Sequence, residues 1–373
     1  MNFHFTYKKE WGLMIFILAL QFLFKNTDAQ NLPSNIEWIR PANDKAPSVW
    51  GIKNGIIFGL WPFSIETGQD KMGGGPRGLI RVGYEFEGNS YLVNFIAIEP
   101  VVNGKMEFSE ISPSRVDGQW GKLLWALDKN IPGKYYPAAI TPGTITHPDP
   151  DHPEVEQLSV FVYMEQYLNG AYPYFKISIR SDHPEEMGIE IFNQQNNAKM
   201  DRCALTATMG NYSRLRLLYL KNQVIDSRKL YKGFDGIGFV EKEDYPADQM
   251  LKDNNGNFFV LAASDESFDS LSAWPQSAKY FNHSNWHYRP FFKVTQYWRK
   301  ENSGNDSTLR VRVNGRAKYW SGGSIDKNDY INIPGGPAFE NFELREKYYA
   351  GQKFYFGISR KTPQEIISEF GGN

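Results

Sequence analysis

Residues 282–289, Asn-His-Ser-Asn-Trp-His-Tyr-Arg, are the densest run of reactive side chains in the sequence. The run offers two bases, His283 and His287, together with the ring of Trp286 and the guanidinium of Arg289. An imidazole titrates close to neutral pH, so either histidine suits a general acid or base. The run has no regular periodicity, and we therefore expect a loop presented by a rigid scaffold. A polar loop whose histidines only satisfy hydrogen bonds is an equally good interpretation.

A second polar segment, residues 210–216, precedes a stretch that alternates like a strand. Alternation would place Tyr212, Arg214 and Arg216 on one face, so that a phenol and two positive charges address one ligand, with Asn211 nearby. Arginine suits a carboxylate ligand because its planar fork donates two parallel hydrogen bonds and stays charged. A ladder of structural ion pairs explains the same pattern almost equally well.

The stretch Gly-Gly-Gly-Pro-Arg-Gly at residues 73–78 matches the glycine pattern of dinucleotide-binding loops. That use of the pattern requires a helix directly after it. Residues 79–84 instead alternate like a strand, and Pro76 lacks an amide hydrogen that a phosphate would need. We therefore reject nucleotide binding and keep Arg77 as a candidate to bind an anionic ligand. A flexible hairpin without a ligand is the alternative.

Residues 147–154 bring together two histidines and three carboxylates, a composition that zinc or calcium could use. Three prolines hold this run extended, which makes it hard for the ligands to converge. We therefore predict a solvated acidic loop around His147 and His152. Residues 253–257 resemble the start of a calcium loop but lack its later glycine and glutamate, so a hairpin turn is expected there. We expect neither an essential metal nor a cofactor.

The N-terminus has the parts of a secretory signal peptide. Lys8 and Lys9 precede an apolar run over residues 11–24, and the small residues Thr27 and Ala29 stand before a cleavage point. The apolar run is short for a bilayer span, so a retained membrane anchor is the weaker alternative. We predict cleavage after Ala29, a secreted or periplasmic location, and no membrane span in the mature chain.

The composition narrows the class of partner. Removing residues 1–29 takes away three basic and two acidic residues and leaves 38 against 40, a net charge of −2. Nucleic acid and anionic membranes attract proteins with a strong basic excess, so neither is an expected partner. The single cysteine, Cys203, is expected to be a buried structural residue. Aromatic residues make up 15% of the chain, which suits stacking on sugar rings but also suits a large β core.

Apolar and polar residues alternate with a period of two along most of the chain, which predicts strands. Turn signals such as residues 87–89 and 313–315 separate these strands. Helix signals are few: residues 362–370 begin with a capping box, and residues 264–274 form a second candidate. We predict a large antiparallel β-sandwich with few short helices, folded as one catalytic domain over residues 30–373. The clearest strand predictions are 79–86, 91–98, 158–163, 175–180, 188–192, 215–220, 258–262, 309–313 and 353–358.

Three segments, residues 35–41, 75–84 and 204–220, prompt a resemblance that covers most of the mature chain. The chain resembles secreted carbohydrate-active proteins encoded in polysaccharide-utilisation loci of marine Bacteroidetes. Within that group it is most similar to the oligosaccharide dehydratases of ulvan degradation, whose chemistry is related to that of polysaccharide lyases. The resemblance implies a uronate-containing oligosaccharide as substrate and does not itself assign catalytic residues.

β-Elimination from a uronate requires three groups. One group neutralises the carboxylate, a base removes the proton on C5, and an acid protonates the oxygen that leaves C4. We predict that this oxygen is a free hydroxyl, so that water leaves and an unsaturated uronate remains at the non-reducing end. The candidates are Arg214 or Arg77 as neutraliser, His287 or His283 as base, and Tyr212 as acid or base, with Asn211, Trp286 and Arg289 as further substrate-binding residues.

Three other functions stay open. If a glycosidic oxygen leaves in place of the hydroxyl, the same chemistry makes the enzyme a polysaccharide lyase. A glycoside hydrolase would need two carboxyls at a defined separation, and Glu99, Glu110 and Asp117 lie near predicted strand ends. A glycan-binding protein without catalysis would leave the clusters of His, Arg and Tyr without a use.

Overall fold

The computed structural model describes residues 36–43, 46–62, 65, 77–127, 141–210, 212–266, 294–302, 307–318 and 332–371. Contacts divide the chain into residues 1–37 and Trp38–Asn373, and the elements below belong to the second unit. Strands account for 48% and helices for 6% of the structure, far from the third that helices average in globular proteins. The prediction of an antiparallel β-sandwich with few short helices is confirmed.

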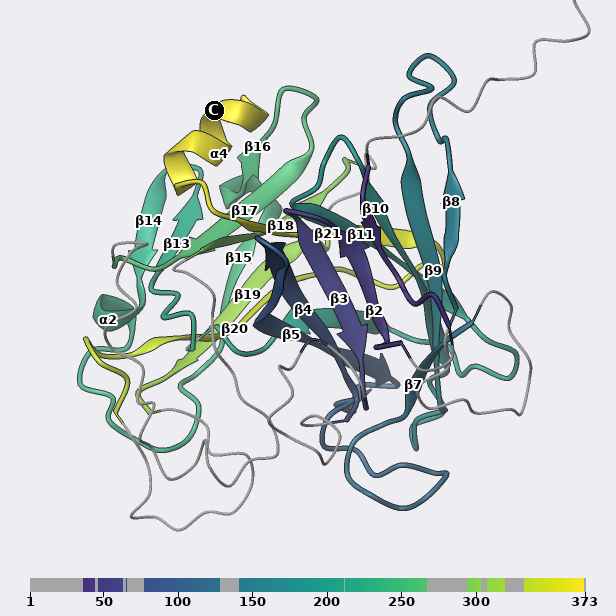
Figure 1. The fold of residues 1–373 in the computed structure, drawn as a ribbon. Helices are drawn as coiled ribbons and strands as arrows, with labels where there is room; N and C mark the ends of the chain where they lie inside the picture. The colour runs from purple at the N-terminus through teal and green to yellow at the C-terminus, as the bar shows by residue number, and fades with distance from the viewer. Residues whose placement is uncertain are drawn as a thin grey trace, which may run out of the picture. The chain divides into compact units, whose positions relative to one another are not determined.

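The first sheet has ten strands in the order β1-β2-β3-β4-β5-β12-β20-β19-β15, with β6 paired to β5 (Figure 1). Its centre joins distant parts of the sequence, because Leu205 pairs with Ile98 on one side and with Leu344 on the other. The strands are β1 (Trp38–Ile39), β2 (Val49–Ile52), β3 (Ile56–Leu60), β4 (Leu79–Phe86), β5 (Asn89–Val102), β6 (Lys105–Met106), β12 (Arg202–Ala207), β15 (Glu243–Pro246), β19 (Arg310–Arg316) and β20 (Ala338–Arg345).

The second sheet has eleven strands in the order β14-β13-β17-β18-β21-β11-β10-β9-β7, with β16 paired to β17 and β8 to β9. Its β9-β10 pairing shows the expected alternation, with buried Phe175, Ile177 and Ile179 on one face of β10. The strands are β7 (Leu124–Leu127), β8 (Thr144–Thr146), β9 (Gln157–Met164), β10 (Pro173–Arg180), β11 (Glu186–Asn193), β13 (Leu217–Leu220), β14 (Gln223–Asp226), β16 (Leu251–Lys252), β17 (Phe258–Ala263), β18 (Thr295–Lys300) and β21 (Gln352–Ser359).

Three short helical elements occur among the described residues: α2 (Ser227–Leu230), the 3-10 turn η1 (Ala247–Gln249) and α4 (Pro363–Phe370). The predicted C-terminal capping box is present in α4. The Thr362 hydroxyl accepts a hydrogen bond from the Glu365 amide at 3.3 Å, and the Glu365 carboxylate accepts one from the Thr362 amide at 2.7 Å. These two bonds satisfy amides that a helix start leaves without partners. The second candidate helix, at residues 264–274, lies mostly outside the described residues.

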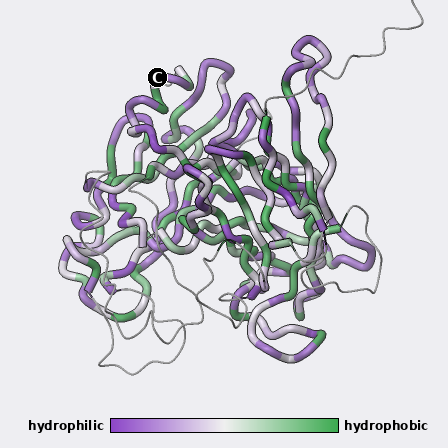
Figure 2. Tube along the Cα trace, viewed as in Figure 1, coloured by the Kyte–Doolittle hydropathy of each residue, from purple (hydrophilic) through white to green (hydrophobic). Residues whose placement is uncertain are grey.

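The sandwich interior is apolar, with a few polar ties between the sheets. Figure 2 shows apolar residues gathered in the strands and hydrophilic ones in the outer loops. The indole nitrogen of Trp298 in β18 donates to the Phe342 carbonyl of β20 at 2.9 Å, and the Asn94 amide of β5 donates to Gln296 at 2.6 Å. Cys203 lies between β5 and β20, is buried as expected, and has a thiol pKa raised well above its usual value by burial.

The turn predicted at residues 313–315 is wrong, because these residues lie inside β19. Asn314 pairs with Asn341 and Gly315 with Phe339, so Glu340 is the extra residue of a β-bulge in β20. A Cβ at Gly315 would lie 2.6 Å from the Ala338 carbonyl oxygen, so only glycine permits this approach. The Asn-Gly pair therefore marks a bulge instead of a hairpin.

The strand predicted from residue 215 begins at Leu217, and the residues before it form a turn. Arg214 has a φ of 51°, in the left-handed region that strands do not use. The prediction that Tyr212, Arg214 and Arg216 share one strand face is therefore wrong. The strand predicted after the glycine-rich stretch is present, since β4 begins at Leu79.

Candidate functional site

A pocket of about 320 Å³ lies against the first sheet. Strands β4, β5, β19 and β20 contribute to its wall, as do the segments after β6, after β12 and before β15. Its three glutamates have raised pKa values. The lining residues are Leu79, Glu99, Phe108, Glu110, Ile111, Thr208, Met209, Phe239, Val240, Lys242, Asn314, Arg316, Glu340 and Asn341.

Glu340 reaches the pocket from the bulge in β20. A bulge re-aims a side chain that a regular ladder would hold in the alternating pattern. The Gly210 amide binds the Glu340 carbonyl at 3.0 Å and holds the bulged backbone in place. The side chain is 3% exposed, and its Oε2 has no hydrogen-bond partner among the described residues. Burial raises the pKa of Glu340 to about 7, against a lowering effect of Arg316, whose Nε lies 3.8 Å from Oε1.

Glu110 belongs to a hairpin-like loop, residues 109–122, between β6 and β7. The Lys122 amide binds the Ser109 carbonyl at 2.7 Å and the Gly121 amide binds the Ser112 carbonyl at 3.2 Å, which closes the two arms of the loop. Burial raises the pKa of Glu110 to about 7, while hydrogen bonds from its own backbone and from Ser109 lower it. Its Oε2 is shielded and has no hydrogen-bond partner in the described part of the chain.

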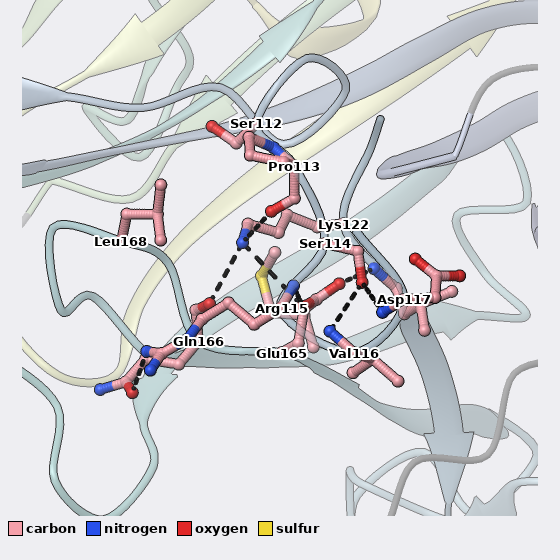
Figure 3. A network of polar contacts seen from close by, with 12 residues as sticks. Ser112, Pro113, Ser114, Arg115, Val116, Asp117, Lys122, Glu165, Gln166 and Leu168 are labelled. Carbon is pink, nitrogen blue, oxygen red and sulfur yellow. Dashed lines mark hydrogen bonds and ion pairs between the residues drawn. The ribbon is translucent and has the colours of Figure 1, made fainter. Parts of the chain in front are cut away.

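Lys122 and Glu165 anchor this loop to the end of β9 (Figure 3). The Lys122 ammonium donates to the carbonyls of Pro113 at 2.8 Å and Gln166 at 3.2 Å, and lies 4.0 Å from the Glu165 carboxylate. Glu165 in turn accepts from the backbone amides of Leu123 at 2.8 Å and Arg115 at 2.5 Å. Both charged side chains are fully buried. Burial lowers the pKa of Lys122, and the charge of Glu165 opposes that effect. The loop that carries Glu110 is therefore held by a satisfied ion pair.

Glu99 differs from the other two glutamates because its counterion is within hydrogen-bond distance. Its Oε2 lies 2.9 Å from Arg312, which also contacts Glu343 at 2.9 Å. Burial and then the charge of Glu343 raise the pKa of Glu99, whereas Arg312 lowers it. The charge of Glu110 raises it further, which places Glu99 and Glu110 within electrostatic reach of each other.

Two cationic residues accompany the acids. The Arg316 guanidinium stacks over the Phe239 ring at 4.0 Å, and Lys242 stands exposed at the pocket wall.

Five shielded polar atoms of the lining have no hydrogen-bond partner among the described residues. They are Oε2 of Glu110, Oε2 of Glu340, Nε of Arg316, Oδ1 of Asn314 and Oδ1 of Asn341. Buried polar atoms are rarely left without hydrogen bonds in proteins, and a catalytic role or a bound molecule is one explanation when they are. The pocket can thus donate to, accept from and exchange protons with one polar ligand.

Two residues of the predicted catalytic set belong to the described residues, and one of them packs against the pocket wall. Tyr212 is 1% exposed and packs in an apolar cluster with Leu79 and Met209, both of which line the pocket. Arg214 is buried and pairs with Glu266 through two contacts of 2.7 and 2.9 Å. The other predicted residues, His283, His287, Trp286, Arg289 and Asn211, lie outside the described residues. Their meeting with Tyr212 and Arg214 stays a prediction.

Arg77 is engaged within the protein. It is 7% exposed, binds Asp117 through bonds of 2.9 and 3.2 Å and Gln119 at 3.2 Å, and stacks over Trp61 at 5.3 Å. It therefore ties the start of β4 to the tip of the 109–122 loop. Burial favours a higher pKa for Asp117, but hydrogen bonds from Arg77 and Gln119 outweigh it and lower the pKa. Neither Arg77 nor Asp117 lines the pocket.

Sequence reasoning named Glu99 and Glu110 only as candidates for hydrolysis, and it missed Glu340, Arg316 and Lys242. The available signal for Glu340 was the two consecutive polar residues Glu340 and Asn341, which break the period-two alternation of the strand opposite an Asn-Gly pair. Bulges at such positions commonly lie next to active sites.

The 147–154 run follows β8 on the surface, where His152 is 64% exposed and lies 3.3 Å from Glu154. The described part of the chain contains no group of three or more His, Cys, Asp or Glu side chains arranged to hold a metal. None of the described helices is long and apolar enough to cross a membrane.

No family model, curated protein or solved structure matches this chain. Function must therefore be inferred from the side chains themselves.

Proposed function

We propose that this chain is a carbohydrate-active enzyme that removes water by β-elimination from the terminal uronate of an oligosaccharide, such as those of the algal polysaccharide ulvan. The pocket is the proposed site. The observation that supports it is the convergence of five polar atoms without hydrogen-bond partners among the described residues, two of them on carboxyls whose pKa is about 7. Carboxyls tuned to neutral pH are well suited to proton transfer. The substrate class is part of the proposal and follows the resemblance to ulvan-degrading dehydratases that the sequence leads us to expect.

Binding would use both the acceptor groups and the positively charged side chains of the pocket. A sugar hydroxyl donates and accepts at once, so it can meet the amide oxygens of Asn314 and Asn341 and the carboxyls beside them. The uronate carboxylate would lie against Arg316, whose Nε has no hydrogen-bond partner among the described residues, with Lys242 adding positive charge. This pairing withdraws charge from the uronate and makes its C5 proton more acidic.

Glu110 and Glu340 would share the acid and base roles of the elimination step. One of them, ionised, removes the proton from C5, and that electron pair forms the C4–C5 double bond. The C4–O bond breaks, and the other glutamate, protonated, gives its proton to the departing hydroxyl, which leaves as water. A pKa of about 7 on both side chains makes the two protonation states accessible together near neutral pH. If the departing oxygen belonged to a glycosidic bond, the same residues would make a lyase.

The decisive experiment incubates the purified protein with uronate-terminated oligosaccharides. Elimination creates a double bond conjugated to the carboxylate, which is read by ultraviolet absorbance. A product that weighs one water less than the substrate identifies a dehydratase, whereas two shorter fragments with the same absorbance identify a lyase. The absence of absorbance with every uronate substrate would overturn the proposal.

Three variants locate the chemistry. Glu340→Gln and Glu110→Gln remove the proposed acid and base, whereas His287→Ala removes the base predicted from the sequence. Loss of turnover in both glutamine variants with full activity in His287→Ala supports the pocket. The reverse result moves the site to the loop at residues 282–289.

Glycoside hydrolysis is the second candidate, and it is favoured by the presence at the same pocket of Glu99 and Glu110, whose charge raises the pKa of Glu99. Hydrolases place two carboxyls on either side of the bond that breaks, one protonated and one ionised. Glu110, whose pKa burial raises and no neighbouring cation lowers, would be the acid, and Glu99, paired with Arg312, would be the ionised partner. Cleavage without new ultraviolet absorbance, with the mass of one water added across the fragments, would select this function over elimination.

A further inference from the structure

Exposed apolar side chains gather on both sides of the pocket. Three lie on the 109–122 loop: Ile111 at 54% exposure, Val116 at 45% and Trp120 at 74%. Two lie on the segment before β15, Ile237 at 37% and Phe239 at 48%. Ile111 and Phe239 themselves line the pocket. A cluster of exposed apolar groups on a folded protein marks a binding surface more often than a scattered few do.

Trp120 is next to the pocket wall. It forms a β-bridge with Pro113, and Ile111 lies two residues from Pro113 on the same arm of the loop. The Gly121 amide bonds to the Ser112 carbonyl and the Lys122 amide to the Ser109 carbonyl, so residues 120–122 lie alongside residues 109–113. Trp120 therefore lies close to the part of the loop that carries Glu110 and Ile111 of the pocket.

The position of Trp120 is set by a rigid support. Its neighbour Gly121 bonds to Ser112, and Lys122 is anchored between two carbonyls by the buried pair with Glu165. At the tip of the loop, Asp117 is held by Arg77. The backbone that presents this large aromatic side chain is thus fixed, which reduces the conformational entropy lost when a ligand covers it.

We infer that Trp120 is the platform on which the second sugar of an oligosaccharide stacks while the terminal sugar occupies the pocket. This inference rests on the proposed function for the identity of the ligand. A pocket of about 320 Å³ is at the lower end of ligand sites, which span about 300–1,000 Å³, and therefore suits one sugar unit. The next unit must lie outside, where an indole can cover the C–H face of a pyranose and leave its hydroxyls in water.

The test measures dissociation constants by calorimetry with two probes, a methyl uronoside and a uronate-terminated disaccharide. The Glu340→Gln protein serves as the parent so that turnover does not consume the probes. Adding Trp120→Ala should weaken disaccharide binding about tenfold and leave methyl uronoside binding unchanged. Trp120→Phe keeps a ring and should recover most of the lost affinity. Val224→Ala, at a 50% exposed valine on β14, is the matched control and should change neither constant.

Equal disaccharide affinity in the Trp120→Ala and Val224→Ala proteins would overturn the platform, as would a parent that binds no disaccharide. A loss for the methyl uronoside equal to that for the disaccharide would also overturn it, because the indole would then belong to the pocket itself. The proposed function fails separately, through the absence of elimination product in the wild-type protein. Selective loss of disaccharide binding would support the platform even then.

Discussion

The Lys122–Glu165 pair and the acids of the pocket are both shielded ionisable groups, but they differ in whether the protein supplies hydrogen-bond partners for them. Lys122 donates to two carbonyls, and Glu165 accepts two backbone amides, so the charge on each side is met by the protein (Figure 3). Glu110 and Glu340 each keep an oxygen without a partner among the described residues, and burial moves the pKa of both towards neutrality.

This difference separates a buried charge that stabilises the fold from a buried charge that is proposed to act in catalysis. A buried ion pair with its hydrogen bonds satisfied is costly to break because removal of one partner strands the other. A buried carboxyl with one oxygen left unbonded lowers stability, and active sites are where such groups often occur. The two regions meet in one loop, since the satisfied pair anchors the segment that carries Glu110.

The largest expected effect is on turnover. Glu340→Gln should lower kcat by a factor of about 10²–10⁴, because it removes a group that exchanges a proton in the transition state. Thermal melting should show a fold at least as stable as the wild type. The matched control is Glu186→Gln, a buried glutamate paired with Arg299 at 2.6 Å outside the pocket lining, which should keep its turnover. Equal losses in both variants would contradict a special role for Glu340.

The second effect is on stability. Lys122→Met should lower the free energy of unfolding by about 3–5 kcal/mol, because Glu165 is left buried without its cation. Urea denaturation measures the change. A loss below about 1 kcal/mol would mean that the pair behaves like a surface ion pair and does not anchor the loop.

The third effect is a pH dependence of stability. The pKa of Glu340 is raised from 4.5 to about 7 in the folded protein, so between these values the folded state binds more protons than the unfolded chain. Its contribution to stability is therefore present at low pH and lost as pH rises to about 7. Relative to wild type, Glu340→Gln should gain up to roughly 3 kcal/mol across that window. A stability difference that stays constant between the two pH values would contradict the raised pKa.

The smallest effect concerns Asp117. Its side chain is 37% exposed, so Asp117→Asn should cost no more than about 1 kcal/mol of stability, measured by urea denaturation. Turnover should change less than about threefold, because a group outside the pocket cannot take part in proton transfer there. A loss of activity as large as that of Glu340→Gln would move the acid–base chemistry to the tip of the 109–122 loop.

Local patterns predicted much of the fold and little of the site. Period-two alternation placed β4 and β10, and the capping box placed α4, because each depends on residues adjacent in sequence. The bulge at Glu340 depends instead on how β20 pairs with β19, and an Asn-Gly pair suits a bulge as well as a turn. The pocket joins β5, β19 and β20 with a loop held by a contact between Lys122 and Glu165. No local pattern encodes such distant pairings.

The rate at which Cys203 is alkylated reports how often the first sheet opens. As the sole cysteine, shielded in β12 and with its pKa raised by burial, it can react with an alkylating reagent only when the strand opens. Since β12 lies between β5 and β20 and leads directly to Thr208 and Met209 of the pocket wall, each labelling event records an opening at the centre of the first sheet. A decrease in the Cys203 labelling rate when a sugar is added would measure how much an occupied pocket stabilises the closed sheet.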